Sequence, residues 1–228
     1  SNLGNALWAA DRLEEAERAY RNAIALDEGF GDAWFNLGKL LLHTGRLPEA
    51  ADALEHVTRI DPDVRTWKML GEAYGQLEQF MEARQAYERA FAASPRDPDI
   101  AASLADCLEK ENRLEDARRM VETTLASNPE HYLGNIIMAI LERRAGRAGE
   151  ARARLLAMPD SSLPVLLQAQ REHELGVLYD LANEYDSAYA CFARAKSLQA
   201  SIPSFSQADR HRYLSRLDRL IELDYSWL

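Results

Sequence analysis

Residues 67–95 read WKMLGEAYGQLEQFMEARQAYERAFAASP. The apolar residues of the first half, Trp67, Leu70 and Tyr74, recur at intervals of three and four positions, which places them on one face of a helix. The second half repeats this spacing around Tyr87, and Pro95 ends it because proline cannot continue a helix. The segment therefore predicts two successive helices that pack on each other.

The same pattern recurs along the chain. Its alanine returns at intervals of 33 to 37 residues, at Ala16, Ala50, Ala83, Ala117, Ala151 and Ala188. A small residue is needed there because the two helices of a pair cross at that point and their backbones approach closely. A second series of small residues does the same on the first helix, at Gly4, Gly38, Gly71, Ala105, Ala139 and Gly176. Six copies of the helix pair are therefore predicted.

The spacing W-x2-L-G-x2-Y, A-x3-aromatic, P resembles the tetratricopeptide repeat. This resemblance implies an all-α fold, a right-handed α-solenoid of about six antiparallel helix pairs. We expect the array to span 1–202, with repeats near 1–30, 31–63, 64–97, 98–131, 132–165 and 169–202. An apolar stripe at helical spacing follows and predicts a capping or connecting helix at 203–228. The segment 158–164, with two prolines and two serines, is the expected site of a kink.

The turn inside each helix pair has its own signature. Five of the six turns carry a residue that tolerates a left-handed backbone, at Asp11, Gly45, Asn112, Gly146 and Asn183. The central repeat has Glu78 instead. Its turn is therefore predicted either to close differently or to be strained.

Composition excludes several classes of function. The net charge of −10 disfavours non-specific binding to nucleic acid or to an anionic membrane surface. No apolar run reaches the length of about 18 residues that a membrane helix needs. The two cysteines, Cys107 and Cys191, have the spacing of neither a metal site nor a disulfide framework, so we expect two buried thiols in a cytoplasmic protein.

The sequence lacks the common motifs of catalysis and cofactor binding. The sequence has no Gly-rich phosphate loop and no dinucleotide-binding fingerprint. His173 and Glu174 lack the second histidine of a zinc-binding H-E-x-x-H motif. The chain is therefore predicted not to be an enzyme and to hold no cofactor and no metal.

A partner-binding surface is expected from the resemblance, because in these repeats the first helices line a concave groove. The residues that lie off the packing stripe are polar and form the predicted groove site: Asn2, Asn5, Asn36, Lys39, Arg65, Lys68, Glu72 and Gln76. Amides can bond the backbone of an extended peptide, and Lys and Arg can meet carboxylates. The alternative is a solvated polar face with no ligand. Trp67, Leu70 and Tyr74 are expected to pack and to carry no recognition.

A second contact patch is predicted in the fifth repeat. It combines three apolar side chains on the groove face with two arginines: Leu133, Ile136, Ile140, Arg143 and Arg144. Apolar residues on such a face need a cover. A partner, the helix at 203–228 or a second copy of the chain in a homo-oligomer could supply it.

The sixth repeat supports a further resemblance. The segment 174–195 and the ending DYSWL (224–228) are similar to the last repeat and connecting helix of bacterial tetratricopeptide sulfotransferases. Three functions stay open at this point. The chain could be a scaffold that binds a peptide or protein segment in its groove, the substrate-recruiting or dimerising part of a larger sulfotransferase, or a purely structural oligomerisation domain.

Overall fold

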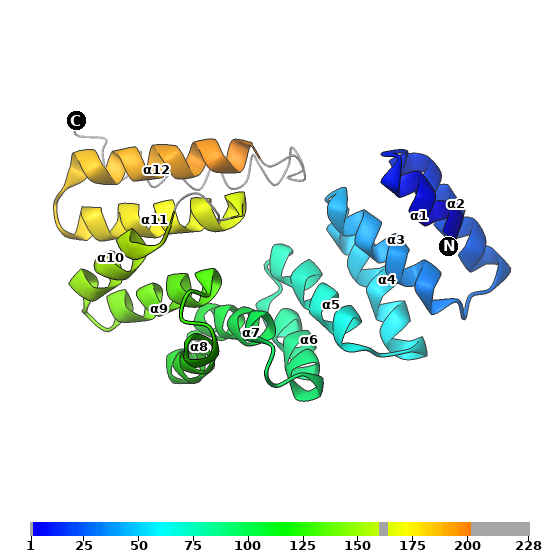
Figure 1. The fold of residues 1–228 in the computed structure, drawn as a ribbon, viewed down its shortest axis with the longest axis horizontal. Helices are drawn as coiled ribbons and strands as arrows, with labels where there is room; N and C mark the ends of the chain where they lie inside the picture. Colours follow the sequence, from blue (N-terminus) through cyan, green and yellow to red (C-terminus); the bar gives the residue numbers. More distant parts are fainter. Residues whose placement is uncertain (1, 160–163, 202–228) are drawn as a thin grey trace. The chain divides into compact units, whose positions relative to one another are not determined.

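The computed structural model describes residues 2–159 and 164–201, and every regular element in these ranges is an α-helix (Figure 1). The twelve helices within them are α1 (Asn2–Ala9), α2 (Leu13–Leu26), α3 (Gly31–His43), α4 (Leu47–Ile60), α5 (Val64–Gln76), α6 (Phe80–Ala93), α7 (Pro98–Lys110), α8 (Leu114–Ser127), α9 (Tyr132–Arg144), α10 (Ala148–Ala157), α11 (Val165–Leu181) and α12 (Tyr185–Ala200). The predicted all-α fold is confirmed. The expected helix at 203–228 lies outside the described residues.

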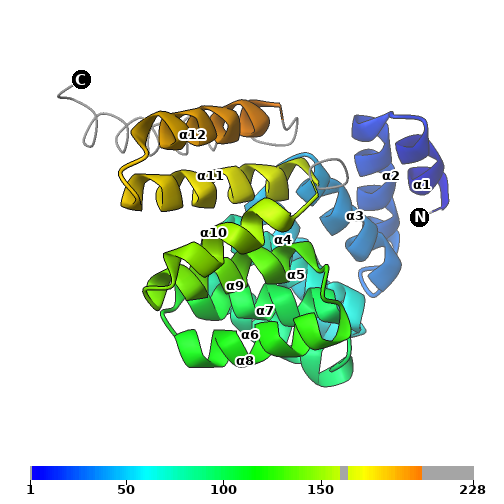
Figure 2. The same ribbon diagram turned by 60° about the vertical axis from the view of Figure 1, so that its left-hand side comes forward.

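Within the two units, successive helices form antiparallel pairs: α1 with α2, α3 with α4, α5 with α6, α9 with α10 and α11 with α12 (Figures 1 and 2). The helices α3, α5, α7 and α9 begin at Gly31, Val64, Pro98 and Tyr132, where the sequence pattern places the starts of repeats. The helix α11 begins at Val165, four residues before the predicted start of the sixth repeat. Pro164 directly precedes it and leaves the following residues free to turn into a helix. The expected kink lies partly outside the described residues.

The chain divides into two compact units, residues 1–120 and 121–228. In the first unit, apolar side chains from both helices of each pair form the core. Leu37, Leu40 and Leu54 are almost fully buried there. In the second unit, a smaller apolar cluster joins α9, α10, α11 and α12 through Ile136, Leu155, Leu178 and Cys191.

The close approach of paired helices explains the small residues of the pattern. A Cβ atom at Gly71 on α5 would lie 2.8 Å from the ring of Tyr87 on α6, which is too close for two carbon atoms. Only glycine therefore lets Tyr87 pack flat against α5. Ala83 on α6 is fully buried in the same helix pair.

Each turn inside a pair has one residue in the left-handed region. The φ angle is 58° at Asp11, 61° at Asn112 and Asn183, 75° at Gly45 and 79° at Gly146. Glu78 has a φ of 60°, so the central repeat closes its turn in the same way as the others. Of the two alternatives predicted for this turn, the structure shows the strained one, because a Cβ atom clashes with the backbone in this region.

Candidate functional site

Three contacts link consecutive first helices on one face of the first unit. The Lys39 amine of α3 lies 5.1 Å from the centre of the Trp8 ring on α1. The Arg65 guanidinium of α5 lies 5.3 Å from the centre of the Phe35 ring on α3, and the Lys68 amine of α5 lies 3.1 Å from an Asp99 carboxylate oxygen on α7. The structure thus brings the predicted basic residues together on adjacent helices. We call this surface the first-helix face.

Other predicted residues of this face are engaged locally. The Gln76 amide donates to the Glu72 carboxylate over 3.3 Å within α5. Neighbouring protein atoms displace water from the Glu72 carboxylate and raise its pKa, and the charge of Lys68 opposes this effect. Arg65 also donates to Asp63 over 2.8 Å. These side chains are exposed or half-buried, so their contacts are weak and can be exchanged for a ligand.

The three predicted asparagines differ from one another. The Asn5 carbonyl accepts a hydrogen bond of 2.7 Å from the Tyr20 hydroxyl, so Asn5 holds α2 against α1. Asn2 is exposed and Asn36 is half-buried, and neither makes a side-chain hydrogen bond to the described part of the chain. The amides of Asn2 and Asn36 therefore both remain available to a peptide backbone.

The second contact patch is only partly exposed. Ile136 is 2% exposed and packs in the core of the second unit with Leu155 and Leu178, so its expected place on a groove face is wrong. Ile136 is covered by residues of α10 and α11, which both contact α9. Ile140 and Leu133 are partly buried. Arg143 pairs with the buried carboxylate of Glu174, and Arg144 is exposed.

The weakened pattern of the fifth repeat has a structural compensation. Asn135 and Glu142 stand where tryptophan and an aromatic residue are expected, and both are buried. The Arg154 guanidinium donates to the Glu142 carboxylate over 2.6 Å and to the Asn135 carbonyl over 3.0 Å. A buried polar network replaces aromatic packing there, and it satisfies the groups that burial would otherwise leave without partners.

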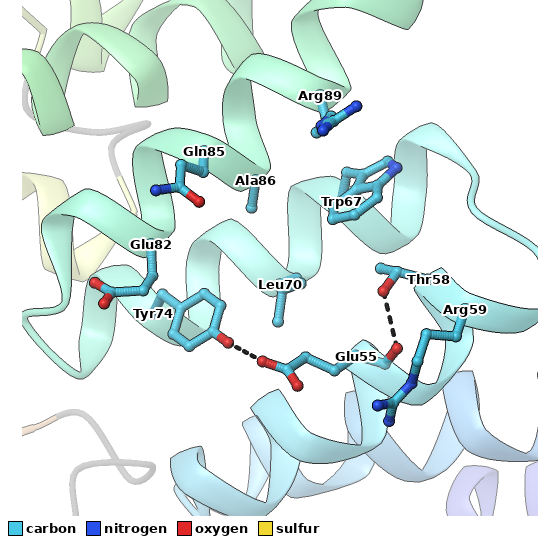
Figure 3. A pocket seen from close by; sticks show the side chains of 10 residues that line it. All are labelled: Glu55, Thr58, Arg59, Trp67, Leu70, Tyr74, Glu82, Gln85, Ala86 and Arg89. Carbon is cyan, nitrogen blue, oxygen red and sulfur yellow. Dashed lines mark hydrogen bonds between the residues drawn. The ribbon is translucent and has the colours of Figure 1, made fainter.

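A pocket of about 310 Å³ lies on the other side of the first unit (Figure 3). The second helices α4 and α6 form its walls, and α5 forms its floor. Its lining residues are Glu55, Thr58, Arg59, Trp67, Leu70, Tyr74, Glu82, Gln85, Ala86 and Arg89. Leu70 and Ala86 are each 3% exposed, whereas the Trp67 and Tyr74 rings are only half-buried. Residues expected only to pack thus also line an open pocket.

Charge is divided between the two ends of this pocket. Glu82 and Tyr74 lie toward one end and Trp67 and Arg89 toward the other, whereas Arg59 lies beside Glu55 (Figure 3). The Tyr74 hydroxyl donates to the Glu55 carboxylate. Burial, followed by this hydrogen bond, raises the pKa of Tyr74, so the phenol stays protonated and acts as the donor. In the sequence, the pocket is marked only by two aromatic residues seven positions apart on one helix, Trp67 and Tyr74. The structure shows that both are half-buried.

The described residues contain neither a candidate metal site nor a candidate membrane-spanning helix. Within 2–159 and 164–201, no three His, Cys, Asp or Glu side chains are grouped so that they could hold a metal ion. No helix in the same ranges has the length and apolar character needed to cross a bilayer.

Comparison with known proteins identifies the family. Residues 1–64 match a family model described as tetratricopeptide repeat, and residues 76–136 match a second model with the same description. The protein O-mannosyl-transferase TMTC1 of Homo sapiens is 25% identical over 172 residues, which is 72% of this chain and 20% of that protein. The Hsp70-Hsp90 organizing protein of Triticum aestivum is 32% identical over 104 residues, which is 45% of this chain and 18% of that protein.

The chain therefore spans about a fifth of the length of these two relatives. Their similarity covers the repeats and does not transfer the activity that a name describes. These comparisons give no support to the resemblance between the end of the chain and the tetratricopeptide sulfotransferases.

Solved structures share the fold at low sequence identity. A tetratricopeptide repeat protein from Parabacteroides merdae has a TM-score of 0.71 at 17% identity, over 95% of this chain and 82% of that one. YrrB, described as a tetratricopeptide repeat protein with an unusual peptide-binding site, has a TM-score of 0.54 at 18% identity, over 86% of this chain and 98% of that one. MamA has a TM-score of 0.56 at 16% identity, over 90% of this chain and 99% of that one. The fold, the spacing of the repeats and the two family matches lead to one conclusion: this chain belongs to the tetratricopeptide repeat family.

Proposed function

We propose that this chain is an interaction scaffold whose first-helix face binds an extended segment of a partner protein. The observation that carries the proposal is the set of contacts that joins α1, α3, α5 and α7 through Lys39, Arg65 and Lys68. These contacts hold three basic groups on one surface. The solved YrrB structure, whose description names a peptide-binding site, supports peptide binding as a use of this fold.

The chemistry of the face favours a segment that carries carboxylates. The Lys68 and Asp99 side chains are 38% and 64% exposed, so their ion pair stabilises the fold by no more than about 1 kcal/mol. The exposed cation–π contact of Lys39 is of similar strength, about 0.5–1 kcal/mol. A ligand carboxylate can therefore replace these contacts at little cost. The amide of Asn36 can bond the backbone of the same segment.

A second candidate follows from the relatives. The human relative is named an O-mannosyl-transferase, and this chain matches a fifth of its length. In that setting the repeats would recruit a protein substrate for chemistry done by another part of a larger protein. The sulfotransferase and oligomerisation alternatives have no comparable observation, and Ile136, the centre of the apolar patch expected to mediate self-association, is part of the core.

The proposal is tested with random linear peptides displayed on phage and selected on the purified chain. Selected peptides should be rich in Asp and Glu, and calorimetry should show their affinity falling at least about tenfold in the double variant Lys39→Ala, Lys68→Ala. Each charged hydrogen bond lost costs about 1.5–3 kcal/mol, and about 1.4 kcal/mol is a factor of ten in affinity. Arg89→Ala, on the pocket side, is the matched control and should bind these peptides as wild type does. Equal affinity of the selected peptides for the wild type and for the double variant would refute binding at this face.

A further inference from the structure

The pocket between α4 and α6 lies on a different surface from the first-helix face. We propose that it receives one large apolar side chain from an amphipathic helix of a partner protein. An acidic residue of that helix would lie near Arg89, and a basic residue would lie near Glu82. The proposal is independent of the function argued above, because the two sites share no residue.

The first argument is the state of the charged groups at the rim. Arg59, Glu82 and Arg89 make no ion pair and no side-chain hydrogen bond to the described residues. Arginines nearby behave differently. Arg46, which directly precedes α4, contacts Glu17 over 2.7 Å and Glu49 over 2.5 Å, and Arg84 on α6 contacts both Glu88 and Glu111. Other arginines of this unit are thus paired within the chain, whereas a positive and a negative side chain of the pocket remain available to a ligand.

The second argument comes from the neighbouring repeats, where the same positions are closed. In the preceding repeat, His56 stands at the position of Arg89 and stacks on Trp34, with ring centres 4.3 Å apart and planes 6° apart. Glu49 stands at the position of Glu82 and is held by Arg46 and Arg21. The position of Tyr74 is taken by Leu41, which is 1% exposed. Different residues at equivalent positions therefore close this site in the second repeat and leave it open in the third.

The following repeat closes the site in another way. Its residue at the position of Trp67 is Ala101, which is buried and supplies no ring. Asp116 stands at the position of Glu82 and is bound by Arg113 and Arg119. The open aromatic wall with unpaired charges at both ends is thus specific to the central repeat among these three.

The spacing of the charges points to a helical ligand. Glu82 and Arg89 are seven positions apart on α6, which corresponds to about 10 Å along the helix axis at 1.5 Å per residue. A partner helix with an acidic residue at i and a basic residue at i+7 has the same spacing. A leucine at i+4 shares that face and lies between the charges. In an extended strand, residues about 10 Å apart are three positions apart, because the rise is about 3.3 Å per residue, and their side chains point to opposite faces.

The size of the pocket sets how the helix is held. A volume of about 310 Å³ is near the lower limit of ligand pockets, which span about 300–1,000 Å³. It admits one side chain and not a helix backbone, so the helix lies across the mouth and inserts its leucine toward Leu70 and Ala86. An acidic residue early in the helix and a basic one late also match the ligand's own dipole. This order makes the ligand antiparallel to α6.

The experiment uses an alanine-based helical peptide, stapled on its outer face, with glutamate at i, leucine at i+4 and lysine at i+7. Binding is followed by NMR through the indole N–H signal of Trp67, which Trp67→Phe assigns. The peptide should shift this signal, and replacing its leucine by alanine should weaken binding at least about tenfold, since the leucine supplies the buried apolar contact.

Charge reversal provides the decisive control. Arg89→Glu should weaken binding at least about tenfold, and a peptide with lysine in place of its glutamate should recover affinity for that variant. Arg96→Glu makes the same charge change on an exposed residue outside the pocket and should have little effect. The proposal is overturned if the Trp67 signal does not shift, if reversal gives no recovery, or if the leucine proves dispensable. Loss of binding in the Lys39, Lys68 double variant would also overturn it, because the peptide would then occupy the first-helix face.

Discussion

Glu78 shows how one residue can depart from the pattern of a repeat without changing its fold. It adopts a φ of 60°, as Asp11, Asn112 and Asn183 do at the same place in other repeats. Asp and Asn tolerate this region because their short polar side chains bond locally, whereas Glu lacks that compensation. The packing of α5 on α6 imposes this turn geometry, and the resulting backbone strain is located at Glu78.

Relieving this strain should stabilise the protein. We expect Glu78→Gly to raise the free energy of unfolding by about 1 kcal/mol, because glycine has no Cβ atom to clash in the left-handed region. Urea denaturation followed by circular dichroism measures the change. Glu78→Ala keeps the Cβ atom and should give no such gain. Equal effects of the two variants would show that the gain does not come from the backbone.

At the scale of helices, two glycines of α5 have opposite roles. Gly71 faces the Tyr87 ring at a distance that excludes a Cβ atom, whereas a Cβ atom at Gly75 would meet nothing within 4 Å. Gly71 is therefore required by the packing of the helix pair. Gly75 only adds conformational freedom to the unfolded chain.

Alanine at these two positions should change stability in opposite directions. Gly71→Ala should destabilise the protein by about 1–3 kcal/mol, because the new methyl group overpacks the contact with Tyr87. Gly75→Ala should stabilise it by about 0.5–1 kcal/mol through higher helix propensity. Thermal unfolding of the two variants side by side tests both. A loss of stability in Gly75→Ala would contradict the open space found beside that residue.

At the scale of the whole molecule, the two compact units each contain one buried thiol. Cys107 lies in the first unit and Cys191 in the second, and they are 3% and 2% exposed. Burial raises the pKa of the Cys107 thiol to about 12 and also raises the pKa of Cys191. Both thiols should therefore react with alkylating reagents only when their surroundings open.

This makes the cysteines reporters of local opening. In a repeat array, contacts are made mainly between neighbours, so a packing defect should loosen its own region most. Gly71→Ala should speed alkylation of Cys107 more than that of Cys191, by about tenfold for each 1.4 kcal/mol of local stability lost. Gly176→Ala, whose Cβ atom would lie 2.6 Å from the Phe192 ring, should do the reverse. Mass spectrometry of the labelled peptides gives both rates. Equal acceleration at both thiols would mean that the chain opens as one cooperative unit.

Parts of this architecture follow from sequence because they depend on contacts within one repeat. The starts of α3, α5, α7 and α9 are marked by local signals, such as Pro98 at the first position of α7 and the Asp63 cap that accepts from the Thr66 amide. Burial of a residue by helices of another repeat is harder to predict from the sequence. Ile136 has the position of a groove residue but lies in the core, because α10 and α11 cover it.

By itself, the sequence determined the all-α repeat fold, since its small residues, turn residues and prolines recur at a period that allows one arrangement of helix pairs. It also marked Lys39, Arg65 and Lys68 as one surface. Only the tertiary structure decided the role of residues 67–95. Trp67, Leu70 and Tyr74 pack as the motif requires, yet they also line a pocket. The pocket is open because Glu82 and Arg89 of α6 make no ion pair across it with the described residues and because α4 of the preceding repeat forms its other wall. Glu82 and Arg89 belong to the same repeat as Trp67, but the wall from α4 belongs to the preceding repeat, so the pattern within one repeat cannot encode the whole pocket.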